Sequence, residues 1–341
     1  MKPIEKISVV GLGTLGTQIA IQAAAYGYAV CGFDPEPSAF AKMQTKVRGA
    51  MQMTGKGPTF PIAQWEEHAR KVQVYDDLSR AIGAADLVIE VVPEELETKR
   101  KVFAELDRLA PRHALLATNS SSIPISRIES ATQRPEKCLN IHFYQPAVGM
   151  NMADIMGGTR TTPDSLSTAR DFVRSVACVP LPVQKEILGF CFNSVWRAVK
   201  RQSLYMWAGG FVDFRDIDRA WMVFTGMTYG PFFLMDLVGL DVIFAIEKVY
   251  FLESGDPRDE PPLALKKKSA AENWALRREG ASIRIPTPNA QETDFYREND
   301  TVRTDGSSQL CRTTSGSSDA HFLARSMSEM GGKAHFGPAI E

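Results

Sequence analysis

One short run near the N-terminus constrains the fold of this chain more than any other feature. Residues 7–16 read Ile-Ser-Val-Val-Gly-Leu-Gly-Thr-Leu-Gly, which is a G-x-G-x-x-G turn directly after a short apolar strand. A helix is predicted to follow over residues 15–26, and Gly27 closes it. The run therefore predicts a strand, a tight turn and a helix, the opening unit of an α/β fold.

Each glycine of this turn has a separate physical role. Gly11 allows the tight turn, Gly13 lets the backbone approach a pyrophosphate, and Gly16 lets the helix pack closely on the strand. Thr14 and Leu15, where the helix begins, offer N–H donors and the positive end of the helix dipole. The turn therefore predicts a dinucleotide site, although an ordinary strand–helix turn is the alternative interpretation.

An acidic residue after the second strand indicates which dinucleotide binds. The strand expected over residues 29–33 ends at Asp34, roughly 20 residues beyond the glycines, where a carboxylate suits a ribose 2′-hydroxyl. A 2′-phosphate would be repelled by Asp34, and no arginine follows it directly. These residues favour NAD over NADP.

Composition narrows the classes of protein to consider. With 341 residues, 44% of them hydrophobic, and a net charge of −1, the chain can form about two globular domains and has no global attraction to nucleic acid or an anionic membrane. The cysteines have no metal-ligand spacing, so we expect reduced thiols and no metal: Cys31, Cys138, Cys178, Cys191 and Cys311. No leader precedes the first strand and no apolar run reaches the ~18 residues of a membrane span, so a cytoplasmic protein is expected.

The expected secondary structure changes twice along the chain. Strand-like runs alternate with helical or loop segments at 87–92, 114–118, 139–143 and 179–183, which predicts a parallel sheet. Helical stretches then follow at 189–207, 215–227 and 231–252. The fold class predicted is α/β, with an N-terminal parallel-sheet domain over 1–185 and an all-α domain over 186–268. Residues 269–341 are rich in Ser, Thr, Gly and Arg and are expected to be disordered.

The helical region has more large apolar residues than one helical layer of this size would hide. A homodimer face and a dense core are both consistent with this excess.

Four polar residues between positions 118 and 193 are candidates for chemistry, because they lie at expected strand ends and helix starts, where a parallel sheet presents its ligand crevice. His142 ends an apolar strand and could accept a proton. Asp154 could orient it, and Ser121 and Asn193 could donate hydrogen bonds to a substrate oxygen. A structural histidine and helix-capping roles for Ser121 and Asn193 are the alternatives.

Six motifs occur together in a specific order: Gly11-x-Gly13-x-x-Gly16, Glu90-x-x-x-Glu94, Asn119-Ser120-Ser121-Ser122-Ile123, His142-Phe143-Tyr144-Gln145-Pro146, Gly189-Phe190-x-x-Asn193 and Gly230-Pro231-x-x-Leu234-x-Asp236-x-x-Gly239-Leu240-Asp241. Over residues 4 to 268 the chain resembles the 3-hydroxyacyl-CoA dehydrogenase family. The resemblance implies a Rossmann domain, a helical dimerisation domain, and reversible NAD-dependent oxidation of an L-3-hydroxyacyl-CoA.

The resemblance also implies roles for individual residues. His142 matches the general base, Ser121 and Asn193 match contacts of the substrate oxygen, and Asp34 matches the adenosine ribose acid. The other positions that match the cofactor side are Glu94, Lys99 and Asn119.

Three positions depart from the family pattern. Asp154 stands where the family usually has Glu, Gln145 where it has Asn, and Leu188 where it has Pro. Because Asp is one methylene shorter, we expect its strand to shift by about a bond length, or a water to bridge, and such a misplacement can cost ~100-fold in rate. Partners for the phosphates of coenzyme A are less defined: a basic helical face, which could equally be solvated, holds Lys42, Lys46, Arg48 and Lys56.

The C-terminal region lacks the family's closing Gly-Phe-Tyr-x-Tyr segment. Back-translation of residues 272–286 permits codons that, read one nucleotide earlier, spell Gly-Glu-Leu-Gly-Val-Lys-Thr-Gly-Arg-Gly-Phe-Tyr-Thr-Tyr-Pro. We therefore hypothesise a frameshift near Lys268, which codons incompatible with the shifted reading would rule out.

Two other functions remain open. A related dehydrogenase could act on a small free hydroxy acid or a carnitine-like substrate, and a cofactor-binding protein could lack turnover. Activity that requires the coenzyme A portion of the substrate would distinguish an acyl-CoA dehydrogenase from the first alternative. A change in rate when Glu replaces Asp154 would distinguish an enzyme from the second, because a protein without turnover would show none.

Overall fold

The computed structural model describes residues 3–36, 38–54, 57–144 and 151–270. All of these residues belong to the same compact unit. The expectations for the C-terminal segment after residue 270, including the frameshift, lie outside the described residues, as do Lys56 and Gln145.

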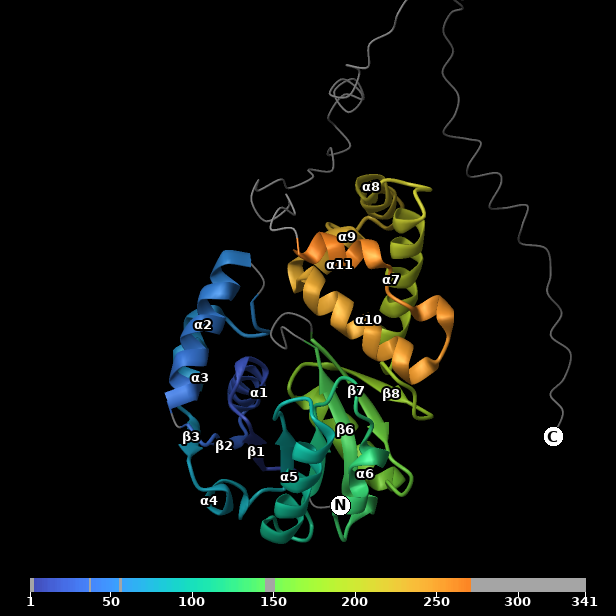
Figure 1. Ribbon diagram of the computed structural model, residues 1–341. Coiled ribbons are helices and arrows are strands. Elements are labelled where there is room, and N and C mark those ends of the chain that lie inside the picture. Colours follow the sequence, from blue (N-terminus) through green and yellow to red (C-terminus); the bar gives the residue numbers. More distant parts are fainter. Residues whose placement is uncertain (1–2, 37, 55–56, 145–150, 271–341) are drawn as a thin grey trace, which may run out of the picture. The chain divides into compact units, whose positions relative to one another are not determined.

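The chain opens with the strand–turn–helix unit that its glycines predict (Figure 1). Strand β1 spans Lys6–Val10, helix α1 spans Thr14–Ala25 and strand β2 spans Ala29–Phe33. Four of the five β1 residues are buried, which matches the apolar run between the turn and the N-terminus. Gly27 has φ +89°, a conformation that ends the helix at little cost for glycine.

Eight strands form a single sheet in the order β3-β2-β1-β4-β5-β6-β7-β8. The remaining strands are β3 Val72–Tyr75, β4 Leu87–Glu90, β5 Leu115–Thr118, β6 Cys138–Phe143, β7 Met152–Gly157 and β8 Val179–Val183. The expectation of a wholly parallel sheet needs correction, because β7 runs antiparallel to β6. All other pairs are parallel.

The strand-like runs identified in the sequence include neither β3 nor β7, although Asp154 was expected to lie on a strand. In β7 the apolar run Met-Ala-Asp-Ile-Met-Gly is interrupted by Asp154, a residue that disfavours strands. This carboxylate is nevertheless fully buried, because it hydrogen-bonds to His142 and Tyr144 on the neighbouring chain segment. The tertiary partners therefore permit a strand that local propensity opposes.

Helices cover both faces of the sheet (Figure 1). One apolar core lies against α1, α2 (Ser38–Thr54), α3 (Trp65–Ala69) and α6 (Pro163–Ser175). A second core lies on the other face, against α4 (Leu78–Ile82) and α5 (Leu96–Leu109). Short 3-10 turns complete this region: η1 Ile62–Gln64, η2 Ile125–Arg127, η3 Glu129–Ala131 and η4 Pro135–Lys137.

The chain becomes helical after β8. The elements are α7 Phe192–Ala208, α8 Phe214–Thr225, α9 Pro231–Val238, α10 Leu240–Ser254, η5 Pro257–Asp259 and α11 Leu263–Ala270. The single helix expected over residues 231–252 is wrong, because Gly239, at φ +106°, separates α9 from α10. A small core built around Phe232 and Met235 holds these helices together. Nowhere in the described ranges is a helix both long enough and apolar enough to cross a bilayer.

Candidate active site

The glycine turn has the shape that a bound pyrophosphate requires. Gly11 has φ +98°, and a Cβ there would lie 2.7 Å from the Val91 carbonyl oxygen. A Cβ on Gly16 would lie 1.9 Å from the Gly11 oxygen, whereas a Cβ on Gly13 would meet nothing within 4 Å. Gly11 and Gly16 are therefore needed by the protein itself, and Gly13 borders open space at the start of α1. The residues fit the pyrophosphate of a dinucleotide.

Asp34 lies at the end of β2, next to this turn. Its carboxylate accepts hydrogen bonds from the Leu12 amide at 2.9 Å and the Glu36 amide at 3.0 Å. The side chain remains partly exposed, so it can also accept from a ribose hydroxyl.

A buried ion-pair network lies at the ends of β4 and β5. The Lys99 side chain is 1% exposed, and its Nζ lies 2.8 Å from Glu90 Oε1 and 3.2 Å from Glu94 Oε2. Thr118 donates to the other Glu90 oxygen at 2.7 Å. Glu94 and Lys99 were expected from the sequence, whereas Glu90, whose fully buried side chain lies nearer to Lys99 than Glu94 does, was given no role.

Glu94 also organises the serine turn that follows β5. Its Oε1 accepts from Ser120 Oγ at 2.5 Å, from Ser122 Oγ at 2.8 Å, and from the Ser121 amide at 3.1 Å. Burial opposes ionisation of this carboxyl, but the Lys99 ammonium and the serine donors outweigh it, so the pKa of Glu94 is lowered. The Ser121 hydroxyl has no hydrogen-bond partner within the described residues and can donate to a ligand.

His142 and Asp154 face each other across β6 and β7. They are directly opposite in the antiparallel register, and His142 Nδ1 lies 3.2 Å from Asp154 Oδ2. The contact is direct, so the shorter aspartate needs no bridging water. Both side chains are buried, and because Nδ1 faces Asp154, Nε2 is the ring nitrogen available for proton transfer.

The segment before α7 packs on this pair. The Phe190 ring stacks on the His142 ring with centroids 4.9 Å apart and planes 13° apart. Gly189 and Phe190 have φ values of +82° and +52°, a left-handed turn that is uncommon for phenylalanine. The Cys191 amide then donates to Asp154 Oδ1 at 3.3 Å. This turn carries Asn193 toward the same region.

Three of the predicted site residues line one cavity of about 450 Å³: Glu94, Ser121 and Asn193. Its other walls are mainly apolar residues of α10, together with Trp196 and Lys200 of α7. His142 does not line this cavity; Phe190, which stacks on the His142 ring, precedes the lining residue Asn193 by three positions. Asn119 has a different place, because its Oδ1 accepts from the Phe143 amide at 2.8 Å and ties β5 to the residue after His142.

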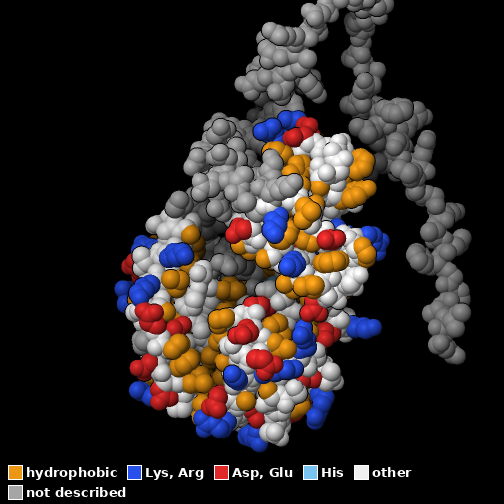
Figure 2. Space-filling model, in the orientation of Figure 1, with side chains coloured by type: hydrophobic (Ala, Val, Ile, Leu, Met, Phe, Trp, Pro, Cys, Tyr) orange, Lys and Arg blue, Asp and Glu red, His pale blue; other side chains and the backbone are white. Residues whose placement is uncertain are grey.

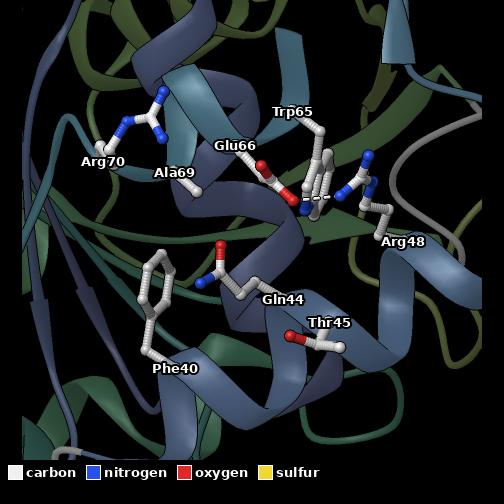
Figure 3. A pocket seen from close by; sticks show the side chains of 8 residues that line it. All are labelled: Phe40, Gln44, Thr45, Arg48, Trp65, Glu66, Ala69 and Arg70. Atoms are coloured by element: carbon white, nitrogen blue, oxygen red, sulfur yellow. Dashed lines mark hydrogen bonds and ion pairs between the residues drawn. The ribbon is translucent and has the colours of Figure 1, made fainter. Parts of the chain in front are cut away.

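The basic residues considered for coenzyme A do not converge on this cavity. Lys42 pairs with Glu36 at 2.5 Å, and Arg48 pairs with Glu66. Arg48 lines a separate pocket of about 400 Å³ between α2 and α3, shown in Figure 3. The described residues therefore show no shared phosphate site for this basic face.

The α/β fold, the glycine turn and the buried histidine–carboxylate pair together define a dinucleotide-dependent oxidoreductase. Residues 6–187 match the NAD binding domain of 3-hydroxyacyl-CoA dehydrogenase, and residues 189–282 match the C-terminal domain of the same enzyme. The chain belongs to the 3-hydroxyacyl-CoA dehydrogenase family and uses NAD.

Relatives within this family act on different substrates. The chain is 31% identical to a 3-hydroxybutyryl-CoA dehydrogenase of Clostridioides difficile, over 74% of this chain and 89% of the relative. It is 30% identical to the 5-formyl-3-hydroxy-2-methylpyridine 4-carboxylate 5-dehydrogenase of Mesorhizobium japonicum, over 79% of this chain and 87% of the relative. The solved structure of a diketoreductase aligns with a TM-score of 0.70 at 30% identity, covering 79% of this chain and 93% of that one.

Proposed function

We propose that this protein catalyses the reversible oxidation of an L-3-hydroxyacyl-CoA to the 3-ketoacyl-CoA. The observation that carries the proposal is the buried His142–Asp154 pair. The turn at Phe190 stacks on this pair and leads to Asn193, which lines the apolar cavity together with Ser121. An apolar cavity with a few polar groups at one end suits an acyl chain whose oxygen must be oriented.

In this proposal His142 Nε2 accepts the proton of the substrate hydroxyl. Asp154 holds the imidazole in one orientation and stabilises the imidazolium, while Ser121 and Asn193 donate hydrogen bonds to the oxygen as negative charge develops on it. NAD supplies the acceptor for the hydride that leaves C3. General-base catalysis of this kind contributes about 10²- to 10⁴-fold in rate.

The cofactor side of the proposal assigns the pyrophosphate to the glycine turn, with Gly11, Gly13, Thr14, Leu15 and Gly16. The ribose is assigned to Asp34. Glu94, Lys99 and Asn119 would shape the nicotinamide end of the crevice, since their contacts order the strand ends around the candidate base.

The test is NADH oxidation by the purified protein with acetoacetyl-CoA, with free acetoacetate as the matched substrate lacking coenzyme A. Turnover confined to the thioester, and lost in His142→Ala but kept in His113→Gln, is the expected result. His113 is a suitable control because it pairs with Asp86, away from the candidate site, at 2.8 Å.

A second candidate function is oxidation of a small substrate without coenzyme A. It is supported by the relative that acts on a pyridine carboxylate. It is also supported by the pairing of Lys42 with Glu36 and of Arg48 with Glu66, which engages these cations within the protein. Turnover of free hydroxy acids or L-carnitine, with none on the thioester, would establish it. NADH binding without turnover on any of these substrates would instead indicate a non-catalytic protein.

We also propose that the protein is a homodimer in the cytoplasm. Large apolar side chains are exposed on the helical region, among them Phe224 at 93%, Leu252 at 70% and Val223 at 69%, and Figure 2 shows apolar side chains over this part of the surface. A second copy that covers them would remove this apolar area from water. A monomeric mass in analytical ultracentrifugation would contradict the dimer.

A further inference from the structure

Tyr144 shares one carboxylate oxygen with the candidate base. Its hydroxyl donates to Asp154 Oδ2, the same oxygen that lies 3.2 Å from His142 Nδ1. The Tyr144 ring also packs edge-on against the His142 ring, with centroids 4.5 Å apart. A second edge-on contact, to Phe192 at 5.5 Å, holds the phenol from its other side.

We propose that Tyr144 is a positioning residue, which orients the Asp154 carboxylate and sets the basicity of His142 through it. The inference rests on the proposed role of His142 as the base. It extends that proposal from a pair to a chain of three groups, in which Tyr144 donates to Asp154 and Asp154 accepts from His142.

The position of Asp154 explains why a third group is needed. The side chain is fully buried, and a buried carboxylate is costly unless its oxygens are hydrogen-bonded. Oδ1 accepts from the Cys191 amide at 3.3 Å, and Oδ2 accepts from both Tyr144 and His142. Donors on both oxygens prevent the carboxylate from rotating away from the imidazole.

The Tyr144 hydroxyl is the donor toward Asp154, while its oxygen also interacts with the backbone of Phe192 and Asn193. Burial and the neighbouring Asp154 carboxylate raise the pKa of the phenol well above its ordinary value. The hydroxyl therefore stays protonated at neutral pH and remains able to donate to Asp154.

The other charged groups around the pair have partners elsewhere. On the elements packed against β6 and β7, Arg127 of η2 pairs with Glu253, and Arg174 of α6 pairs with Asp171 at 3.5 Å. Arg170 of α6 donates to Ser167 at 3.1 Å. The α6 helix also carries Asp164, β5 has no charged residue, and the Cys191 thiol is exposed. Within the described part of the chain, Asp154 is the one charged group that contacts His142.

The sign of the effect follows from competition for one oxygen. A hydrogen bond from Tyr144 draws charge from Oδ2 and weakens the attraction of Asp154 for an imidazolium. Removing the hydroxyl makes the carboxylate a stronger acceptor, so the pKa of His142 should rise. Less neutral imidazole is then present at a given pH, and activity in the oxidation direction should fall on the acidic side.

The test compares Tyr144→Phe with Tyr28→Phe. Tyr28 is the matched control, because it also loses a hydroxyl hydrogen bond, to Ser175 at 2.5 Å, and this bond involves neither Asp154 nor His142. The first readout is the NMR titration of His142 in the unliganded protein, and the second is the pH profile of kcat/KM. We expect Tyr144→Phe to raise the His142 pKa by about 0.5 to 1 unit and to move the acidic limb equally, with no change in Tyr28→Phe.

A folded Tyr144→Phe protein whose His142 titration is unchanged would overturn the inference. If that variant does not fold, 3-fluorotyrosine introduced at position 144 keeps the shape and is a stronger donor, so the His142 pKa should fall; an unchanged or raised value would refute the proposal. The titration needs no turnover. Activity that survives in His142→Ala would reject His142 as the base. The NMR titration would still decide, independently of activity, whether Tyr144 changes the basicity of His142.

Discussion

Replacing Gly13 with alanine should separate cofactor binding from protein stability. The Gly13 backbone has φ −64° and ψ −168°, values that alanine can adopt, and the added Cβ would meet no protein atom within 4 Å. Gly13 is also the residue before α1, where alanine is a poorer cap than glycine, so we expect a loss of no more than about 1 kcal/mol in the free energy of unfolding.

The same methyl group should strongly weaken NADH binding. It would occupy the open space beside the helix N-terminus, where the pyrophosphate must approach the backbone amides. Lengthening or losing one or two charge-assisted hydrogen bonds, at about 1.5 to 3 kcal/mol each, predicts a dissociation constant at least ~10-fold higher. NADH fluorescence titration measures this constant, and thermal unfolding measures stability.

Gly49→Ala is the control for this experiment. Gly49 lies in α2, and its added Cβ also meets nothing within 4 Å, so alanine there should leave NADH binding unchanged and slightly stabilise the helix. An unchanged NADH dissociation constant in a folded Gly13→Ala protein would refute the assignment of the pyrophosphate to this turn.

Three further predictions follow from the buried and titrating groups. Lys99→Met should destabilise the protein by about 3 to 5 kcal/mol, because it leaves buried Glu90 without its cation; urea denaturation that shows a loss below ~1 kcal/mol would contradict this. The lowered pKa of Glu94 means that its contribution to stability is present above its unfolded value and is lost as pH falls through the folded value, so the stability gap between wild type and Glu94→Gln should shrink on acidification below about pH 4.5. Burial raises the pKa of Cys138 to about 12 and of Cys178 to about 11, so neither thiol should be alkylated by iodoacetamide at pH 8 in the native protein, as mass spectrometry of the labelled peptides would show.

Local patterns predicted well those parts of the fold whose signals are local. The strand–turn–helix at the start of the chain is confirmed, because glycines with special conformations and short apolar strands leave direct marks in a sequence. The single helix expected over residues 231–252 was wrong for a related reason. Apolar residues on both sides of Gly239 suggested one continuous helix. Only the observed φ of +106° shows that this glycine divides two helices.

The sequence motifs proposed members of the candidate site but not the contacts between them. Motif order selected His142, Asp154, Ser121 and Asn193, yet gave no reason to include Glu90 or Tyr144. Both residues belong to the family motifs, but the sequence does not show that Glu90 is buried beside Lys99 or that the Tyr144 hydroxyl is buried beside Asp154.

The sequence by itself determined the chain's class, because a glycine turn, an acid after the second strand and ordered motifs depend on local geometry and spacing. Only the tertiary structure decided that a shorter aspartate still reaches His142 directly, since the antiparallel pairing of β7 with β6 places the two residues opposite each other. Strand pairing brings together residues twelve positions apart through backbone hydrogen bonds, and these depend on the whole sheet rather than on the residues between them.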